Sequence, residues 1–201
     1  FEWNSWGRVD INDCQIHRFP DDYAHLNSIQ VAPDGNLVLS LRGCGQVLKI
    51  DRISGSGDTI WNLGGETPLL QIVGDSFEEF CGQHTALEDA EGNLYLYDNG
   101  GPCNGNREEV YGTFSRALMY SLDLQASQAV FVRDYSLNGT YTEYTTSGGS
   151  FFPVKNGNWL INWAKNVNDI TEVTPDNSIA LHLTVNNAGE PIPVYRVHRE
   201  Y

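Results

Sequence analysis

The sequence predicts an all-β protein, and within that class a β-propeller. A unit of four short strands occurs three times, and each unit begins with a hairpin whose turn ends in Gly-Asn. No segment has the convincing periodicity of a helix. The glycines of the three turns, Gly35, Gly92 and Gly157, are 57 and 65 residues apart. Four strands repeated at such a spacing are typical of propeller blades, whereas a β-sandwich would not repeat the same hairpin in register.

The three hairpins define the first two strands of each unit. Their turns are Asp34-Gly35-Asn36, Glu91-Gly92-Asn93 and Asn156-Gly157-Asn158, each with apolar segments on both sides. Glycine supplies the positive φ that a tight hairpin turn requires.

Apolar segments after each hairpin are the expected third and fourth strands. The third strands are 47–50, 117–120 and 170–173. The fourth strands are 59–61, 129–132 and 179–182. We therefore expect one domain, residues 1–201, with blades at about 25–65, 84–135 and 147–185.

Both ends of the sequence read as strands without a complete blade. Residues 1–6 resemble the fourth strand of a blade, and residues 191–199 follow the third unit as an orphan strand. Three blades do not close a ring, because propellers typically have four to eight. We expect the remaining blades to come from a second chain or from a segment missing from this sequence.

The charge balance excludes several partners. The chain has 201 residues with 12 Lys and Arg against 26 Asp and Glu, a formal net charge of −14. This charge argues against nucleic acid or an anionic membrane surface as the main partner. No run of about 18 apolar residues is present, so no membrane span is expected. An anionic ligand would need a local basic pocket.

The cysteines indicate an oxidising compartment. They are Cys14, Cys44, Cys81 and Cys103, an even number without a C-x-x-C motif. Disulfides in an extracellular or periplasmic protein are the favoured interpretation, and free thiols in a cytosolic protein are the alternative. The economical pairing is Cys14–Cys44 with Cys81–Cys103, within one blade each. The competing pairing, Cys14–Cys81 with Cys44–Cys103, would join neighbouring blades.

Two histidines are candidate functional residues. His25 and His84 begin the first strands of successive blades, and equivalent positions in neighbouring blades converge on the propeller axis. The third blade offers Ser147 at this place. Arg116 and Arg107 are the candidate cations for an anion. The alternatives are that each histidine caps its strand and that the arginines pair with acidic residues. No metal site and no cofactor are expected.

The order of several short motifs resembles the arylsulfotransferases of bacteria and their relatives in fungi and archaea. The motifs are His25-x-Asn27-Ser28, Val47-Leu-Lys-Ile-Asp51, Ile60-Trp61-Asn-Leu-Gly-Gly65, Gln83-His84-Thr85-Ala86, Tyr97-Asp98-Asn99-Gly100, Ser115-Arg116-Ala117, and Asn156-Gly157-Asn158 with Asn162-Trp163. The likeness extends from about residue 1 to residue 199.

The resemblance implies an exported six-bladed propeller, of which this chain would be the C-terminal half. It implies transfer of a sulfuryl group from a small aryl sulfate to a phenol through a sulfated histidine, without a nucleotide donor. His25 and His84 would then be catalytic, and Arg116 or Arg107 would neutralise the sulfate. The implied substrate-binding residues are Asn27, Gln83 and Asn99.

The third blade departs from the pattern of that family, in which the sulfated histidine lies on a later blade than the Gln-His-Thr motif. Near the channel this blade offers Ser147, Ser150 and Asn162. Its histidines are His182, in an outer strand, and His198, near the end of the sequence. A non-catalytic propeller that binds a ligand or serves extracellular assembly is therefore the alternative function.

Overall fold

A computed structural model describes residues 1–14, 22–101, 112–164, 167–187 and 189–197. Within these residues the fold contains strands and no α-helix. The helical turns are the 3-10 segments η1 (Ile11–Asp13), η3 (Arg42–Cys44) and η4 (Leu137–Gly139). None of the helical turns in the described part of the chain has the length and apolar character needed to cross a membrane.

The first sheet is a four-stranded antiparallel meander. Its strands are β1 (Leu26–Val31), β2 (Leu37–Leu41), β3 (Gln46–Ile50) and β4 (Thr59–Gly64). The turn between β1 and β2 contains Gly35 with a φ of 86°, as its place in the hairpin predicted.

The second sheet repeats this order. Its meander strands are β6 (His84–Glu88), β7 (Asn93–Asp98), β8 (Arg116–Asp123) and β9 (Gln128–Ser136). A short strand, β5 (Gln71–Val73), pairs in parallel with β9 and covers the outer edge of the sheet.

The third sheet has the same order again. Its strands are β10 (Ser150–Pro153), β11 (Trp159–Asn162), β12 (Asp169–Val173) and β13 (Ile179–Thr184). A two-stranded ribbon of β14 (Asn186–Asn187) and β15 (Glu190–Pro191) follows. The predicted third and fourth strands all lie within the observed ones.

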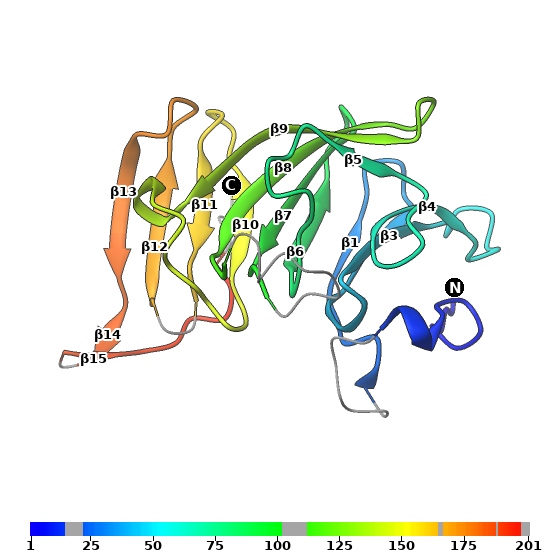
Figure 1. The fold of residues 1–201 in the computed structure, drawn as a ribbon, viewed down its shortest axis with the longest axis horizontal. Helices are drawn as coiled ribbons and strands as arrows, with labels where there is room; N and C mark the ends of the chain where they lie inside the picture. Colours follow the sequence, from blue (N-terminus) through cyan, green and yellow to red (C-terminus); the bar gives the residue numbers. More distant parts are fainter. Residues whose placement is uncertain (15–21, 102–111, 165–166, 188, 198–201) are drawn as a thin grey trace.

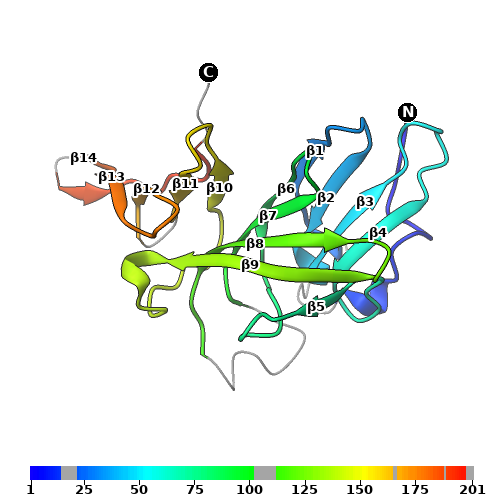
Figure 2. The same cartoon turned by 90° about the horizontal axis from the view of Figure 1, so that it is seen from above.

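The three sheets follow one another side by side, with β10–β13 at one end and β1–β4 at the other (Figures 1 and 2). The first strands are neighbours, since β1 contacts β6 and β6 contacts β10. One apolar core, which includes Val38, Trp61 and Leu96, fills the space between the first and second sheets. Another, which includes Tyr97, Phe151 and Trp163, fills the space between the second and third sheets. Meander sheets packed face to face with adjacent first strands are the architecture of a β-propeller.

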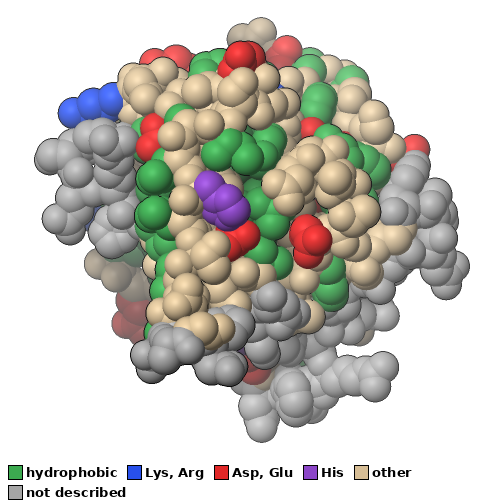
Figure 3. All heavy atoms as spheres, turned by 90° about the vertical axis from the view of Figure 1, so that its left-hand side faces the viewer, with side chains coloured by type: hydrophobic (Ala, Val, Ile, Leu, Met, Phe, Trp, Pro, Cys, Tyr) green, Lys and Arg blue, Asp and Glu red, His purple; other side chains and the backbone are tan. Residues whose placement is uncertain are grey.

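The outer strand of the third sheet is exposed along its whole length. Leu181 and Leu183 on this strand are 41% and 48% exposed. Figure 3 shows this side of the molecule, where hydrophobic side chains lie at the surface.

The two ends of the chain differ from the prediction. Residues 1–6 form no strand. Instead Trp3 packs against the core of the first sheet and donates a hydrogen bond to the carbonyl of Gly57 at 3.1 Å. In the region predicted as an orphan strand, only Glu190–Pro191 is a strand, and residues 192–197 run across other elements without forming a ladder. A strand needs a neighbouring edge with free backbone groups, and neither segment meets one among the described residues.

The predicted Cys14–Cys44 disulfide is present. It joins the end of η1 to the end of η3, beside Leu39, Leu41 and Leu48 of the first sheet. Cys81 is disulfide-bonded as well. The Cys81–Cys103 pairing stays a prediction, because Cys103 lies outside the described residues.

Replacing both Cys14 and Cys44 by serine should lower the free energy of unfolding by about 2–4 kcal/mol, because the bond restricts the unfolded chain over 30 residues. Urea unfolding of the two proteins measures the difference. Equal midpoints and equal slopes would contradict the expectation. Reduction of the wild-type protein should give the same loss as the double substitution if the other disulfide is left intact.

Candidate functional site

His84 is the central residue of the candidate site. It begins β6 and is 1% exposed. Next to it, Thr85 has a φ of 51°, and the pairing of β6 with β7 shifts register between His84 and Ala86. A bulge of this kind changes the direction of a side chain at the end of a strand. His25 directly precedes β1 and has a φ of 44°, and the pairing of β1 with β2 shifts register between Leu26 and Ser28.

Both ring nitrogens of His84 make hydrogen bonds. Nδ1 lies 2.7 Å from Oδ1 of Asn99. Nε2 accepts from the backbone N–H of Gly148 at 3.2 Å. An amide oxygen only accepts and a backbone N–H only donates, so the proton resides on Nδ1 and the lone pair on Nε2.

His84 is neutral at physiological pH. Burial lowers its pKa to about 4, and the nearby charge of Arg42 acts in the same direction. The hydrogen bond that His84 donates to Asn99 opposes these effects without overcoming them. A neutral imidazole with its lone pair on a known nitrogen is a competent nucleophile or base.

Asn99 is held rigidly at the end of β7. Its Nδ2 donates to the carbonyls of Thr145 and Gly148 at 2.8 and 3.1 Å. Its own carbonyl accepts from the hydroxyl of Ser115 at 2.8 Å. The three partners lie on two different segments, so Asn99 ties the second sheet to the chain that leads into the third. Asn99 was predicted to bind substrate, but its amide is occupied in orienting His84.

Arg42 is a cation whose charge acts on His84. Its Nη2 donates to the carbonyl of Thr146 at 3.3 Å, so the side chain reaches from the first sheet to the segment before the third. Burial lowers the pKa of Arg42, and the neighbouring Tyr144 and Tyr195 oppose that effect. An arginine stays charged under these conditions.

Sequence reasoning missed Arg42, although the signal was present. Leu26 of β1 pairs with Leu41 of β2, so the residue before one and the residue after the other lie side by side. The backbone N–H of Arg42 accordingly donates to the carbonyl of His25 at 3.1 Å. Hairpin pairing alone predicts that Arg42 and His25 are neighbours.

His25 lies at the edge of the site. Its Nδ1 bonds to Oδ2 of Asp22, and its side chain is about one-third exposed, at 35%. His25 also interacts electrostatically with His84. The structure therefore brings the two predicted histidines and Arg42 together.

Asn27 and Gln83 join the first two sheets. Asn27 Nδ2 donates to the carbonyl of Gln83 at 2.6 Å. Gln83 Nε2 donates to the carbonyl of Gln46 at 3.0 Å and contacts Ser40 and Leu41. The side-chain oxygens of Asn27 and Gln83 are buried and have no hydrogen-bond partner among the described residues. The amide nitrogens of both side chains are already bonded to protein carbonyls. If Asn27 and Gln83 bind substrate, as predicted, their side-chain oxygens are the atoms left to do so.

Arg116, which was expected to bind the substrate sulfate, pairs with acidic side chains in the structure. Arg116 is fully buried, with Nε 2.9 Å from Asp98 and both Nη atoms within 2.9 Å of Asp75. Asp134 and the carbonyl of Glu79 accept its remaining bonds. All its donors are taken by protein oxygens, which is the alternative that the sequence left open. Arg107 lies outside the described residues.

The candidates of the third sheet have structural partners. Ser150 exchanges hydrogen bonds with the backbone of Val197, and Asn162 donates to the carbonyl of Val194. Ser147 has an intermediate burial and lies next to Gly148. His182 pairs with Asp169 on the outer strand. His198 lies outside the described residues.

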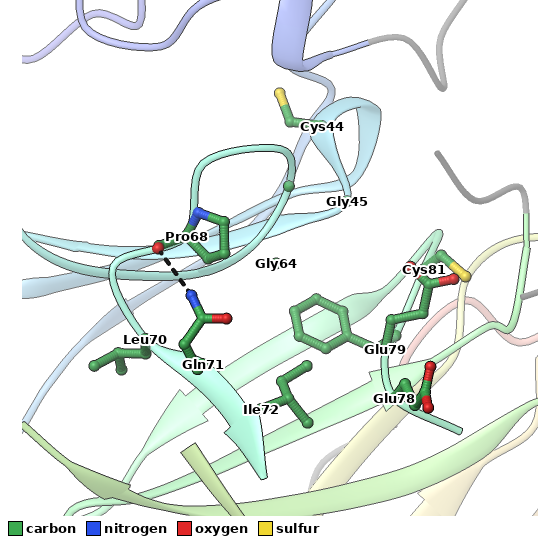
Figure 4. Close-up of a pocket in the computed structure, with 12 residues that line it drawn as sticks. Cys44, Gly45, Gly64, Pro68, Leu70, Gln71, Ile72, Glu78, Glu79 and Cys81 are labelled. Atoms are coloured by element: carbon green, nitrogen blue, oxygen red, sulfur yellow. Dashed lines mark hydrogen bonds between the residues drawn. The ribbon is translucent and has the colours of Figure 1, made fainter. Parts of the chain in front are cut away.

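A cavity of about 250 Å³ lies between the first two sheets (Figure 4). Gly45, Gly64 and Pro68 form one wall, and Glu78, Glu79 and Cys81 lie on the opposite side. No Lys, Arg or His is among its lining residues. Glu78 and Glu79 bring two carboxylates to this cavity, and negative charge repels a sulfate, so the cavity does not fit an anionic substrate.

The fold and the site together define a β-propeller with a buried neutral histidine and a cation beside its first strands. Residues 4–196 match the family described as Arylsulfotransferase (ASST), so the chain belongs to the arylsulfotransferase family. Comparison with curated protein sequences gives no match.

Several solved structures are similar to the chain. A protein of unknown function from Bacteroides caccae is 12% identical at a TM-score of 0.46, covering 80% of this chain and 46% of that one. Virginiamycin B lyase from Staphylococcus aureus is 14% identical at a TM-score of 0.46, covering 86% and 44%. The extracellular domain of a two-component system from B. thetaiotaomicron is 13% identical at a TM-score of 0.49, covering 77% and 18%. The chain thus spans less than half the length of each.

Proposed function

We propose that this chain carries the histidine site of an arylsulfotransferase that moves a sulfuryl group from a small aryl sulfate to a phenol. The observation that carries the proposal is His84, buried, neutral, and fixed in one tautomer beside Arg42. Membership of the arylsulfotransferase family supports the reaction class.

His84 Nε2 is the proposed nucleophile. Its lone pair attacks sulfur, an N–S bond forms, and the S–O bond to the aryl group breaks with the electron pair leaving on the phenolate oxygen. His25, which is bonded to Asp22 through Nδ1, is the proposed general acid for that oxygen. His25 then takes the proton of an acceptor phenol, the phenol oxygen attacks sulfur, and the N–S bond breaks with its electron pair returning to Nε2 of His84.

Arg42 is the proposed binder of the sulfuryl oxygens. Negative charge spreads over three oxygens during this transfer, and a planar guanidinium stabilises such charge, most effectively where water is excluded. Arg42 is 9% exposed, so its guanidinium lies where most water is excluded. Its charge acts on His84, so it lies within electrostatic range of the proposed nucleophile.

The proposal also covers the location of the protein and the completion of its propeller ring. The Cys14–Cys44 disulfide supports an extracellular or periplasmic location. The exposed outer strand of the third sheet supports packing of further blades against it, from a second chain or from another segment, to close a ring that we infer to be six-bladed.

A second candidate function is ligand binding without turnover. His84 Nε2 already accepts from Gly148, and the imidazole is 1% exposed, so a substrate must displace this contact before the nitrogen can react. No third histidine joins the site among the described residues. A propeller that binds an aryl anion at Arg42 would explain these features.

Sulfuryl transfer forms a sulfated His84 as an intermediate, whereas ligand binding without turnover does not. The purified protein is mixed with 4-nitrophenyl sulfate and quenched rapidly, and its peptides are analysed by mass spectrometry. We expect release of 4-nitrophenol together with a peptide containing His84 that is heavier by one SO₃ group. Binding of the aryl sulfate without release and without the heavier peptide would establish the non-catalytic function. The Arg42→Met variant should lose the release, whereas Arg133→Met, on the outer part of the second sheet, should retain it.

A further inference from the structure

Resting on the proposed function, we infer that Tyr195 recognises the aromatic ring of the ligand. The sequence predicted only an orphan strand at residues 191–199, which include Tyr195. The structure places it directly beside His84, at the only aromatic contact that the imidazole makes among the described residues.

The segment Val194–Val197 crosses the inner strands of the propeller. The carbonyl of Val194 accepts from Asn162 of β11 at 2.8 Å, and the carbonyl of Tyr195 accepts from the N–H of Gly149 at 3.0 Å. Arg196 donates to the carbonyl of Asn27 in β1 at 2.9 Å. Val197 is bonded to Ser150 in β10 in both directions. Bonds at four successive residues hold the backbone of Tyr195 in one place.

The ring of Tyr195 stands next to the imidazole of His84. Its centroid is 5.8 Å from that of His84, with the planes at 80°. It also packs on Gly148, since a Cβ added there would lie 3.3 Å from Cδ2 of Tyr195. Gly148 is the residue whose N–H meets His84 Nε2. The tyrosine therefore borders the position from which a substrate must approach.

One side of this ring is available to a ligand. Tyr195 is 56% exposed, although its backbone is tied to three strands and a loop. An aryl sulfate has a flat apolar ring joined to an anion, so its site must present an aromatic surface next to a cation. Arg42 bonds to the carbonyl of Thr146, and Tyr195 packs on Gly148 two residues further along, so the cation and the aromatic ring lie against the same segment. Aromatic rings prefer offset-stacked or edge-to-face contacts at such a surface.

The test compares an aryl with an alkyl ligand. Binding of phenyl sulfate and of methyl sulfate is measured by calorimetry for wild type, Tyr195→Ala, Tyr195→Phe and Arg196→Ala. We expect Tyr195→Ala to weaken phenyl sulfate binding about five- to tenfold and to leave methyl sulfate binding unchanged, a size typical of one aromatic pair. Tyr195→Phe should retain the preference for the aryl ligand. Arg196→Ala loosens the same segment but keeps the ring, so it should retain the preference too.

Each result has a defined meaning. An equal loss for both ligands in Tyr195→Ala, or loss of the preference in Arg196→Ala, would show that the segment acts only as a structural brace and would overturn the inference. A wild-type protein without any preference for phenyl sulfate would also overturn it. A preference that depends on Tyr195 supports the inference even if wild type releases no phenol, in which case the proposed catalysis alone fails.

Discussion

Replacing Arg116 by methionine should lower the free energy of unfolding by about 3–5 kcal/mol at pH 7, the usual cost of removing one partner from a buried ion pair. The substitution removes the ion pairs that Asp75 and Asp98 make with Arg116 in the core. At present the bonds to Arg116 lower the pKa of Asp75 in spite of the burial that raises it. Without the guanidinium, burial raises this pKa and only the hydrogen bonds from Tyr120 and Phe77 oppose it.

Chemical denaturation at several pH values measures this effect. The loss should shrink as the pH falls, because protonation removes the uncompensated charges. The matched control is Arg133→Met. Arg133 lies over the ring of Trp159 at 3.9 Å and bonds to exposed Asn177, so its replacement should cost about 1 kcal/mol or less. If Arg116 bound substrate instead, its loss would abolish sulfate binding and leave stability nearly unchanged.

Replacing His84 by glutamine should lower sulfuryl transfer at least about 10³-fold, as removal of a nucleophile does in other enzymes that form covalent intermediates. His182→Gln is the control, because His182 is paired with Asp169 on the outer strand of the third sheet. A His84→Gln protein with more than about a tenth of wild-type turnover would contradict the assignment of the nucleophile.

The same residue predicts a pH dependence of stability. The pKa of His84 is about 4 in the folded protein, against 6.5 in the unfolded chain. Between these values the unfolded state binds more protons, so stability falls as the pH falls from about 6.5 to about 4. The full loss from this group is about 3 kcal/mol.

Comparison of wild type with His84→Gln isolates this contribution, because the carboxylates titrate in both proteins. The difference in unfolding free energy should grow with pH over the same range and stay constant above it. Turnover should likewise show no acid limb near pH 6.5, since His84 remains neutral down to about pH 5. A wild-type pH profile that falls to half near pH 6.5 would argue that His84 is accessible to water.

Local pattern was sufficient for the strands and hairpins. Gly35, Gly92 and Gly157 mark turns because the need for a positive φ depends on a few adjacent residues. The Cys14–Cys44 bond was also predictable, because both cysteines precede or follow strands of one sheet. The conformation of the chain ends was not predictable from local pattern. An apolar segment such as residues 1–6 becomes a strand only where the edge of a neighbouring sheet has unpaired backbone groups.

The identity of the cation in the site was decided by tertiary structure. The chain has more than twice as many acidic as basic side chains, so most cations are expected to be neutralised. Which groups each arginine meets depends on pairings far apart in the sequence. Arg116 meets Asp75 from 41 residues upstream and Asp134 from 18 residues downstream, while Arg42 reaches Thr146 across 104 residues.

The sequence by itself determined the all-β class and the strand order within each sheet, and it predicted the two histidines of the proposed site, because hairpin turns and strand starts are local properties. Only the tertiary structure decided that Arg42, Gly148 and Tyr195 surround His84. Gly148 contacts His84 through a backbone N–H, which leaves no signal in the side chain, and Tyr195 lies on a segment that packs without forming a strand. Burial then set the charge of His84, because desolvation depends on every segment packed around the ring.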